Sequence, residues 1–150
     1  MDADPPAGGR RSRPLHRQAF ALVRVAAGGI VGTAARYGLA QALPTESGRW
    51  PTGTFVANLL GSFVLGFLLE ALLRAGPDTD WRQRTRLLVG TGFCGGFTTY
   101  STLVVEADLL VRGHHAVLAL AYVAATVLTG VALAVAGIAV AARVRSRPPT

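Results

Sequence analysis

A run of glycine and hydroxyl residues interrupts one of the most apolar parts of this 150-residue chain. The run reads GFCGGFTTYST and covers residues 92–102. Glycine has low helical propensity, and Ser and Thr hydroxyls compete for backbone hydrogen bonds, so we predict that a helix is broken here. A broken helix inside a membrane exposes carbonyls that can coordinate a cation and N–H groups that can bind an anion. The run therefore predicts an ion site or a pore element.

Isolated polar side chains also lie in other apolar stretches. Asn58 and Arg36 are far from the ends of their stretches, where an amide or a guanidinium needs a hydrogen-bond partner or water. Glu106 lies late in the third stretch, and we expect it to face a water-filled vestibule or to pair with Arg36 or Arg112. Because polar groups are costly inside a membrane, such residues are candidates for function.

Four long apolar stretches must position these residues, at about 20–43, 53–73, 87–111 and 116–142. Each is near or above the roughly 20 residues that a membrane-spanning helix needs. Polar residues gather at the ends of the stretches instead of recurring at helical period, as they would in a soluble bundle. Small residues at four-residue spacing, such as Gly28 and Gly32, predict close helix packing. We predict an all-α membrane protein with four transmembrane helices, of which the third is broken.

The basic residues are all arginines, and they are distributed unevenly. Eleven lie before the first span, between the second and third, or after the fourth, whereas two lie in the connections on the other side. The positive-inside rule then predicts a plasma-membrane protein with both termini in the cytoplasm. We expect a disordered basic tail at 1–18, a four-helix domain at 19–142 and a basic tail at 143–150. Since the arginines flank spans and form no patch with aromatic residues, nucleic acid is not an expected partner.

The residues argue against an enzyme. The Ser, His and acidic residues form no nucleophile and base at plausible positions. The single cysteine, Cys94, lies in the glycine-rich run and is expected to be a small packing residue. A phosphate-binding loop is excluded because the chain has no lysine.

Three motifs resemble the signatures of the Fluc fluoride channels, also called the CrcB family. They are GGIVGTAARY at 28–37, GTFVANLLGSFVLG at 53–66 and GFCGGFTTYST at 92–102, in the family's order and on the family's spans. The resemblance implies a four-helix subunit that pairs antiparallel with a second subunit and exports fluoride passively, which lowers fluoride toxicity. It also implies a structural sodium ion at the helix break, held by backbone carbonyls.

The resemblance also carries functional residues onto this chain. Gly95 and Thr98 match the sodium site. The residues implied for the fluoride path are Asn58, Tyr100, Ser101, Thr102, Leu103, Tyr122 and Thr126. Arg36 matches the arginine of the first motif, and Glu106 joins it as a vestibule or structural polar residue.

One departure from the family concerns the pore walls. The family usually has phenylalanine at the positions of Tyr100 and Leu103, so we expect at least one of two pores to be impaired. An antiparallel homodimer would also require insertion in both orientations, whereas the arginine bias favours one. We therefore expect a heterodimer with a related subunit of opposite orientation, and a homodimer remains the alternative.

Two other functions remain as alternatives. A small multidrug-type exporter also has four spans, but it depends on a carboxylate in its first helix, where this chain carries Arg36 and no acid. A non-conducting assembly subunit would use its polar faces only to bind a larger membrane partner. The expected break in the third helix argues against that function without excluding it.

Overall fold

The computed structural model describes residues 15–76 and 80–144, and the regular elements in these ranges are all helices. In chain order they are α1 (Leu15–Ala42), α2 (Thr52–Arg74), α3 (Asp80–Thr85), the π-helix η1 (Arg86–Cys94), α4 (Gly95–Phe97), α5 (Tyr100–Arg112) and α6 (Ala116–Val144). Four apolar spans in the described residues are long enough to cross a membrane, and α3, η1, α4 and α5 together make the third. The chain is therefore a multi-pass, all-α membrane protein, as predicted.

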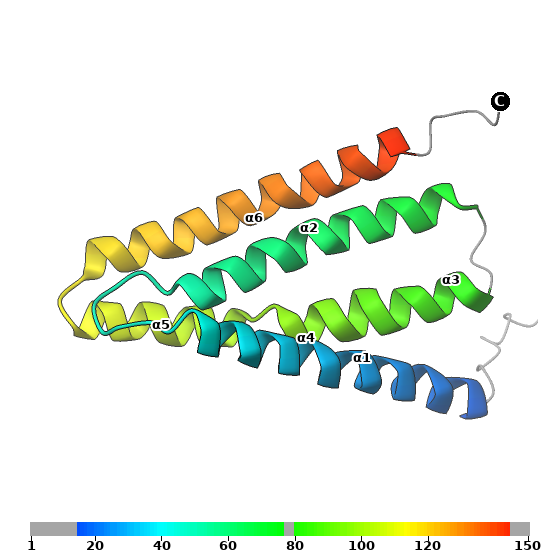
Figure 1. Ribbon diagram of the computed structural model, residues 1–150, viewed down its shortest axis with the longest axis horizontal. Helices are drawn as coiled ribbons and strands as arrows, with labels where there is room; N and C mark the ends of the chain where they lie inside the picture. The colour runs from blue at the N-terminus through cyan, green and yellow to red at the C-terminus, as the bar shows by residue number, and fades with distance from the viewer. Residues whose placement is uncertain (1–14, 77–79, 145–150) are drawn as a thin grey trace, which may run out of the picture.

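The four spans run up and down in alternation (Figure 1). The starts of α1 and α3 and the ends of α2 and α6 lie together, and we call this the arginine-rich end. The α1–α2 and α5–α6 connections lie at the opposite end. Most of the predicted tails, 1–14 and 145–150, lie outside the described residues, but α1 already begins at Leu15, inside the predicted N-terminal tail.

Two helix pairs form the bundle, α2 with α6 and α1 with η1 and α4. Glycines allow the backbones of each pair to touch. A Cβ atom on Gly28 would overlap the carbonyl oxygen of Leu88, and one on Gly66 would overlap that of Ala134. Membrane helices associate through such close contacts because lipid offers no hydrophobic drive for association. The packing role predicted for Gly28 and Gly32 is confirmed, since a Cβ atom on Gly32 would likewise overlap the carbonyl oxygen of Phe93.

The glycines of the third span stay helical, contrary to the simplest expectation from their propensity. Gly92 lies in η1 and Gly96 in α4. A Cβ atom on Gly92 would lie 2.7 Å from the carbonyl oxygen of Val25, and one on Gly96 would meet the backbone of Gly29. These glycines therefore bring the third span against α1, and the interruption follows them in the chain. Cys94, between them, is buried, as expected of a packing residue.

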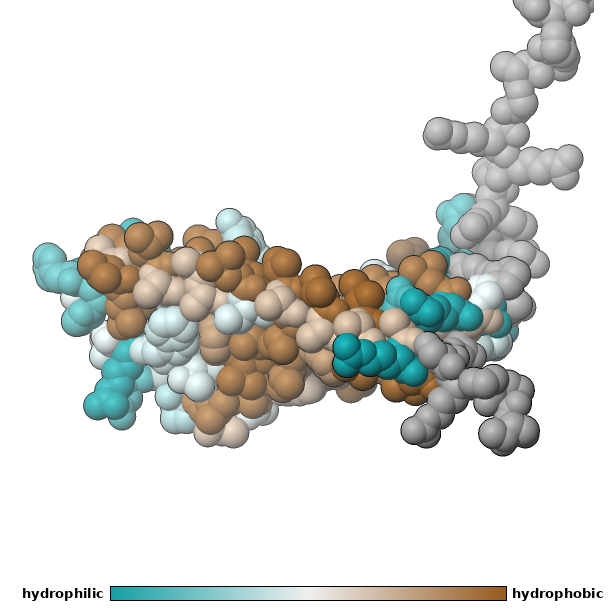
Figure 2. Space-filling model, turned by 90° about the horizontal axis from the view of Figure 1, so that it is seen from above, coloured by the Kyte–Doolittle hydropathy of each residue, from teal (hydrophilic) through white to brown (hydrophobic). Residues whose placement is uncertain are grey.

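Apolar side chains cover the middle of the bundle, and hydrophilic ones gather toward its ends (Figure 2). Many of the exposed side chains are large and apolar, for example Leu22 at 70% and Leu120 at 72% exposed. A surface of this kind suits contact with lipid or with another membrane protein.

Candidate functional site

The third span is interrupted at two consecutive threonines. Thr98 (φ −84°, ψ 157°) and Thr99 (φ −151°, ψ 126°) are extended, between the end of α4 at Phe97 and the start of α5 at Tyr100. The N–H and the hydroxyl of Thr98 both donate to the carbonyl of Cys94, at 2.9 and 2.8 Å. Extended backbone inside a membrane needs partners from elsewhere in the protein, because lipid supplies none.

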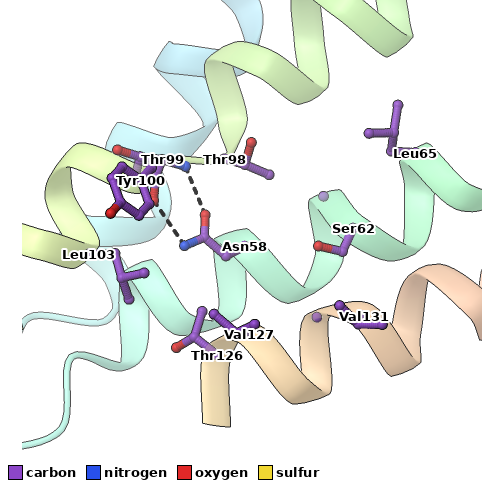
Figure 3. Close-up of a pocket in the computed structure, with 12 residues that line it drawn as sticks. Asn58, Ser62, Leu65, Thr98, Thr99, Tyr100, Leu103, Thr126, Val127 and Val131 are labelled. Carbon is purple, nitrogen blue, oxygen red and sulfur yellow. Dashed lines mark hydrogen bonds between the residues drawn. The ribbon is translucent and has the colours of Figure 1, made fainter. Parts of the chain in front are cut away.

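Asn58 of α2 supplies those partners (Figure 3). Its Nδ2 donates to the carbonyl of Thr99 at 3.0 Å, and its Oδ1 accepts from the N–H of Thr99 at 2.8 Å. One side-chain amide thus satisfies both polar groups of the extended residue, as a neighbouring β-strand would. The prediction that Asn58 must find partners is met by the interruption itself.

Two backbone carbonyls lose the donors that a continuous α-helix would give them. In such a helix the N–H of each residue bonds to the carbonyl four residues earlier, so Gly95 would accept from Thr99 and Thr98 from Thr102. Here the N–H of Thr99 donates to Asn58, and the N–H of Thr102 donates to the hydroxyl oxygen of Thr99 at 3.2 Å. The carbonyls of Gly95 and Thr98 therefore lack their usual helical donors.

Arg36 of α1 joins the two sides of the interruption. Its Nε donates to the carbonyl of Gly96 at 3.2 Å, and its Nη1 donates to the hydroxyl oxygen of Thr102 at 3.3 Å. Gly96 lies in α4 before the interruption and Thr102 in the first turn of α5. A cation is favourable beside the carbonyl end of a helix, so the guanidinium stabilises α4 where it stops.

Glu106 lies in a hydroxyl network. The hydroxyl of Thr54 donates to its Oε1 at 2.9 Å, and the phenol of Tyr122 donates to its Oε2 at 2.7 Å. The prediction that Glu106 pairs with Arg36 or Arg112 is wrong. This face of α5 is turned toward α2 and α6, while Arg36 reaches the interruption and Arg112 pairs with an aspartate on its own helix.

An open groove of about 350 Å³ lies beside the interruption, between α2, α6 and the start of α5 (Figure 3). Its lining residues are Asn58, Gly61, Ser62, Leu65, Thr98, Thr99, Tyr100, Leu103, Thr126, Val127, Gly130 and Val131. Tyr100 is 78% exposed, whereas Leu103 is 5% exposed and packs against buried residues of α5 and α6. The groove combines polar groups of the interruption with an apolar wall, and one of its sides is open.

Comparison with known proteins gives a consistent result. The family described as "CrcB-like protein, Camphor Resistance (CrcB)" matches residues 23–138. The chain belongs to the CrcB family. It is 44% identical over 138 residues to fluoride-specific ion channel FluC 2 of Leifsonia xyli, covering 92% of this chain and 94% of that protein. It is 44% identical over 124 residues to FluC 1 of Cutibacterium acnes (83% and 87% covered) and 41% identical over 129 residues to FluC 3 of Streptomyces avermitilis (83% and 62% covered).

The three motifs that resemble those of the CrcB family meet at one place in the structure. Arg36 of the first motif and Asn58 of the second both bind the third motif, at Thr102 and at Thr99. Side chains of the first two spans therefore both form hydrogen bonds to the interruption of the third.

The structure brings together some of the residues predicted for this CrcB-family chain and separates others. Asn58, Thr98, Tyr100, Leu103 and Thr126 line the groove. The predicted residues outside its lining are Arg36, Gly95, Ser101, Thr102, Glu106 and Tyr122. Their roles in a pore, a sodium site or a vestibule stay predictions.

The site predictions omitted other residues of the groove, and helical spacing was the available signal for two of them. Ser62 follows Asn58 by one turn of α2, and Gly130 follows Thr126 by one turn of α6. The remaining residues of the wall are ordinary apolar or small residues, which no motif distinguishes.

Proposed function

We propose that this chain is a subunit of a fluoride channel through which fluoride leaves the cell passively. The observation that carries the proposal is the interrupted third span in a chain of the CrcB family. Asn58 forms hydrogen bonds to the interruption, and a groove lies beside it. Its relatives are named fluoride-specific ion channels, which favours this function over a multidrug exporter or an assembly subunit.

The groove offers the chemistry that fluoride requires. Fluoride is small and strongly hydrated, so a selective path must replace its water with fixed hydrogen-bond donors. The Asn58 amide has two N–H groups, and one of them donates to Thr99. The second N–H group, the hydroxyls beside the interruption and the electropositive ring edge of Tyr100 are suitable donors. Conduction of this kind needs no catalytic group.

The subunit alone leaves the path incomplete, which supports assembly with a second four-span subunit. The groove is open on one side, and Tyr100 projects from it largely exposed. In the assembly we propose, the partner is antiparallel and closes the groove. A buried, partly desolvated path between two subunits would exclude larger anions by its width.

A structural sodium ion fits the donors at the interruption. The carbonyls of Gly95 and Thr98 lack their usual helical donors, and a Cβ atom built on Gly95 would have no neighbour within 4 Å. Carbonyl oxygens are hard ligands of the kind that alkali cations prefer. Two carbonyls are too few for a cation shell, so the partner subunit would supply the remaining ligands.

The arginine distribution supports a heterodimer with both termini of this chain in the cytoplasm. Eleven arginines flank the arginine-rich end in the sequence and two flank the opposite end, which favours a single orientation in the plasma membrane. The relatives from Leifsonia xyli, Cutibacterium acnes and Streptomyces avermitilis carry numbered names, consistent with more than one such protein per organism. The negative-inside membrane potential then drives fluoride outward.

Fluoride efflux from liposomes tests the function and the assembly separately. The chain is reconstituted alone, or with a second CrcB-family subunit of opposite arginine bias, and fluoride release is followed with a fluoride-selective electrode. We expect release from the pair and little from the chain alone. Robust release from the chain alone contradicts the heterodimer, and absence of release from the folded pair contradicts the channel.

A further inference from the structure

The two ends of the bundle differ in how their arginines are neutralised. At the opposite end, Arg49 pairs with Glu46 at 2.8 Å and Arg112 pairs with Asp108 at 2.7 Å. Both of these arginines therefore have an acid beside them, and that end carries little net charge from these residues.

At the arginine-rich end, Arg74 pairs with Glu70. Arg24, Arg84 and Arg143, in contrast, have no acidic partner among the residues that the structure describes. Unpaired guanidinium groups attract anions, and their planar fork matches the two oxygens of a phosphate. This end of the protein is therefore suited to an anionic partner.

Arg24 and Arg84 hold matching positions on either side of the contact between α1 and the third span, which we call the seam. Arg24 precedes Gly28 by one helical turn, so it lies on the face of α1 that meets η1, where Gly28 touches the carbonyl of Leu88. Arg84, at the end of α3, likewise precedes Leu88 by about one turn. Spans one and three run in the same direction (Figure 1), so both arginines lie about one turn from the Gly28–Leu88 contact, toward the arginine-rich end. Arg24 is half-buried there, while Arg84 is exposed.

Exposed apolar and aromatic side chains lie within about one helical turn of each arginine along the chain. Phe20 is 61% exposed, Val23 65% and Leu88 41%. Trp81 in α3 is 55% exposed, and the guanidinium of Arg82 lies 5.4 Å from its ring centroid. Tryptophan marks the boundary between headgroups and acyl chains, so Arg84, on the same short helix as Trp81, lies near headgroup level. Arg24 lies inside the first span, and its long side chain can extend the guanidinium toward that level.

We propose that Arg24 and Arg84 bind the phosphate of an anionic phospholipid, of the phosphatidylglycerol type, whose acyl chains lie on the adjacent apolar side chains. Charge complementarity favours this occupant, because the guanidinium groups have no acid of the described chain to neutralise them. The apolar surroundings favour a lipid over a free anion. The site goes beyond the proposed channel function and does not depend on fluoride conduction.

The two tryptophans of the chain report on the two ends separately. A Trp50→Phe variant leaves Trp81 at the arginine-rich end, and a Trp81→Phe variant leaves Trp50 at the opposite end. The full chain is placed in phosphatidylcholine vesicles that contain either brominated phosphatidylglycerol or the same fraction of brominated phosphatidylcholine. If a second subunit is added, its tryptophans are replaced by phenylalanine. Bromine quenches tryptophan fluorescence at short range, so quenching measures local lipid enrichment.

We expect brominated phosphatidylglycerol to quench Trp81 more strongly than brominated phosphatidylcholine, with no such preference at Trp50. Each arginine near an anionic lipid contributes about fivefold, so the double variant R24Q/R84Q should weaken the preference by up to about 30-fold. The control R49Q/R112Q removes the same number of charges from the opposite end and should leave it unchanged.

Equal quenching of Trp81 by the two lipids in the otherwise unchanged chain overturns the proposal, and this comparison stands even if the double variant does not fold. An equal loss in R24Q/R84Q and R49Q/R112Q also overturns it, because only net charge would then matter. Loss of the preference in millimolar inorganic phosphate would show a site for free phosphate and would likewise overturn it.

Discussion

Replacement of Asn58 by leucine removes both hydrogen bonds between α2 and the interruption. The N–H and the carbonyl of Thr99 then stay in the bundle without the partners that lie at 2.8 and 3.0 Å in the structure. An unsatisfied buried polar group costs about 1–3 kcal/mol, and these two groups are part-buried, so about 6 kcal/mol is the upper limit of the stability that the variant should lose. Leucine has the same branched arrangement of side-chain heavy atoms as asparagine, which makes lost packing a minor cause. Thermal unfolding in detergent measures the loss, and fluoride efflux from liposomes should fall with it.

Two further variants separate this cause from a general effect of mutation in the groove. Ser62 lies one turn further along α2 and lines the same groove, but it makes no hydrogen bond to the residues that the structure describes. Ser62→Ala should therefore change stability by no more than about 0.5 kcal/mol. Asn58→Asp keeps an acceptor for the N–H of Thr99 but places an oxygen against the carbonyl of Thr99, so it should also lose stability although its size is unchanged. An Asn58→Leu variant that unfolds at the same temperature and conducts normally would refute the role of this amide.

Three other predictions follow from contacts in the bundle. Gly92→Ala places a Cβ atom 2.7 Å from the carbonyl oxygen of Val25, so α1 and η1 must separate and the unfolding temperature should drop. Gly38→Ala is the control, since nothing lies within 4 Å of its added Cβ atom, and it should stabilise α1 by up to about 1 kcal/mol. Glu106→Ala leaves the fully buried Tyr122 hydroxyl without its acceptor and should cost about 1–3 kcal/mol in chemical denaturation, whereas Glu106→Gln keeps one acceptor and should cost less. Replacing sodium by a large organic cation in the buffer should lower the thermal stability of the assembled protein if the proposed ion joins the two subunits; an unchanged melting curve would argue against that ion.

The spans were predictable because the hydropathy of about 20 consecutive residues adds up along the chain. The predicted stretch 53–73 compares with Thr52–Arg74 for α2, and 116–142 compares with Ala116–Val144 for α6. The start of α1 was less predictable, since polar and basic residues precede the apolar stretch and continue the same helix. A helix that leaves the hydrocarbon does not need to end there, so apolar length sets only its minimum extent.

The position of the interruption was predictable only to within the motif. Low propensity pointed to the glycines and the hydroxyl residues alike, but Gly92 and Gly96 are held helical by contact with α1, and the extended residues are Thr98 and Thr99. Propensity is a local quantity, and here packing between spans outweighs it. The sequence alone contains no direct record of which backbones touch.

Polar partners were the least predictable part of the site. Glu106 was expected to face a water-filled vestibule or to pair with Arg36 or Arg112, and it instead accepts hydrogen bonds from Thr54 and Tyr122. The donors that Glu106 meets depend on how α5 is rotated about its axis after the interruption. The two extended residues change that rotation by an amount that helical periodicity does not predict. Asn58 and Arg36 were correctly expected to need partners, but the identity of those partners also depends on this geometry.

The amide that completes the third span is carried by the second, and this order matters during synthesis. The chain is made from its N-terminus, so α2 with Asn58 reaches the translocon before Thr98 and Thr99 are made. When the broken segment enters the bilayer, the helix that carries the Asn58 amide, its hydrogen-bond partner at Thr99, has therefore already been made. A rearranged gene that encoded the third span before the second would send two unpaired threonines into lipid first, and we expect its product to insert poorly even if every contact of the finished bundle were still available.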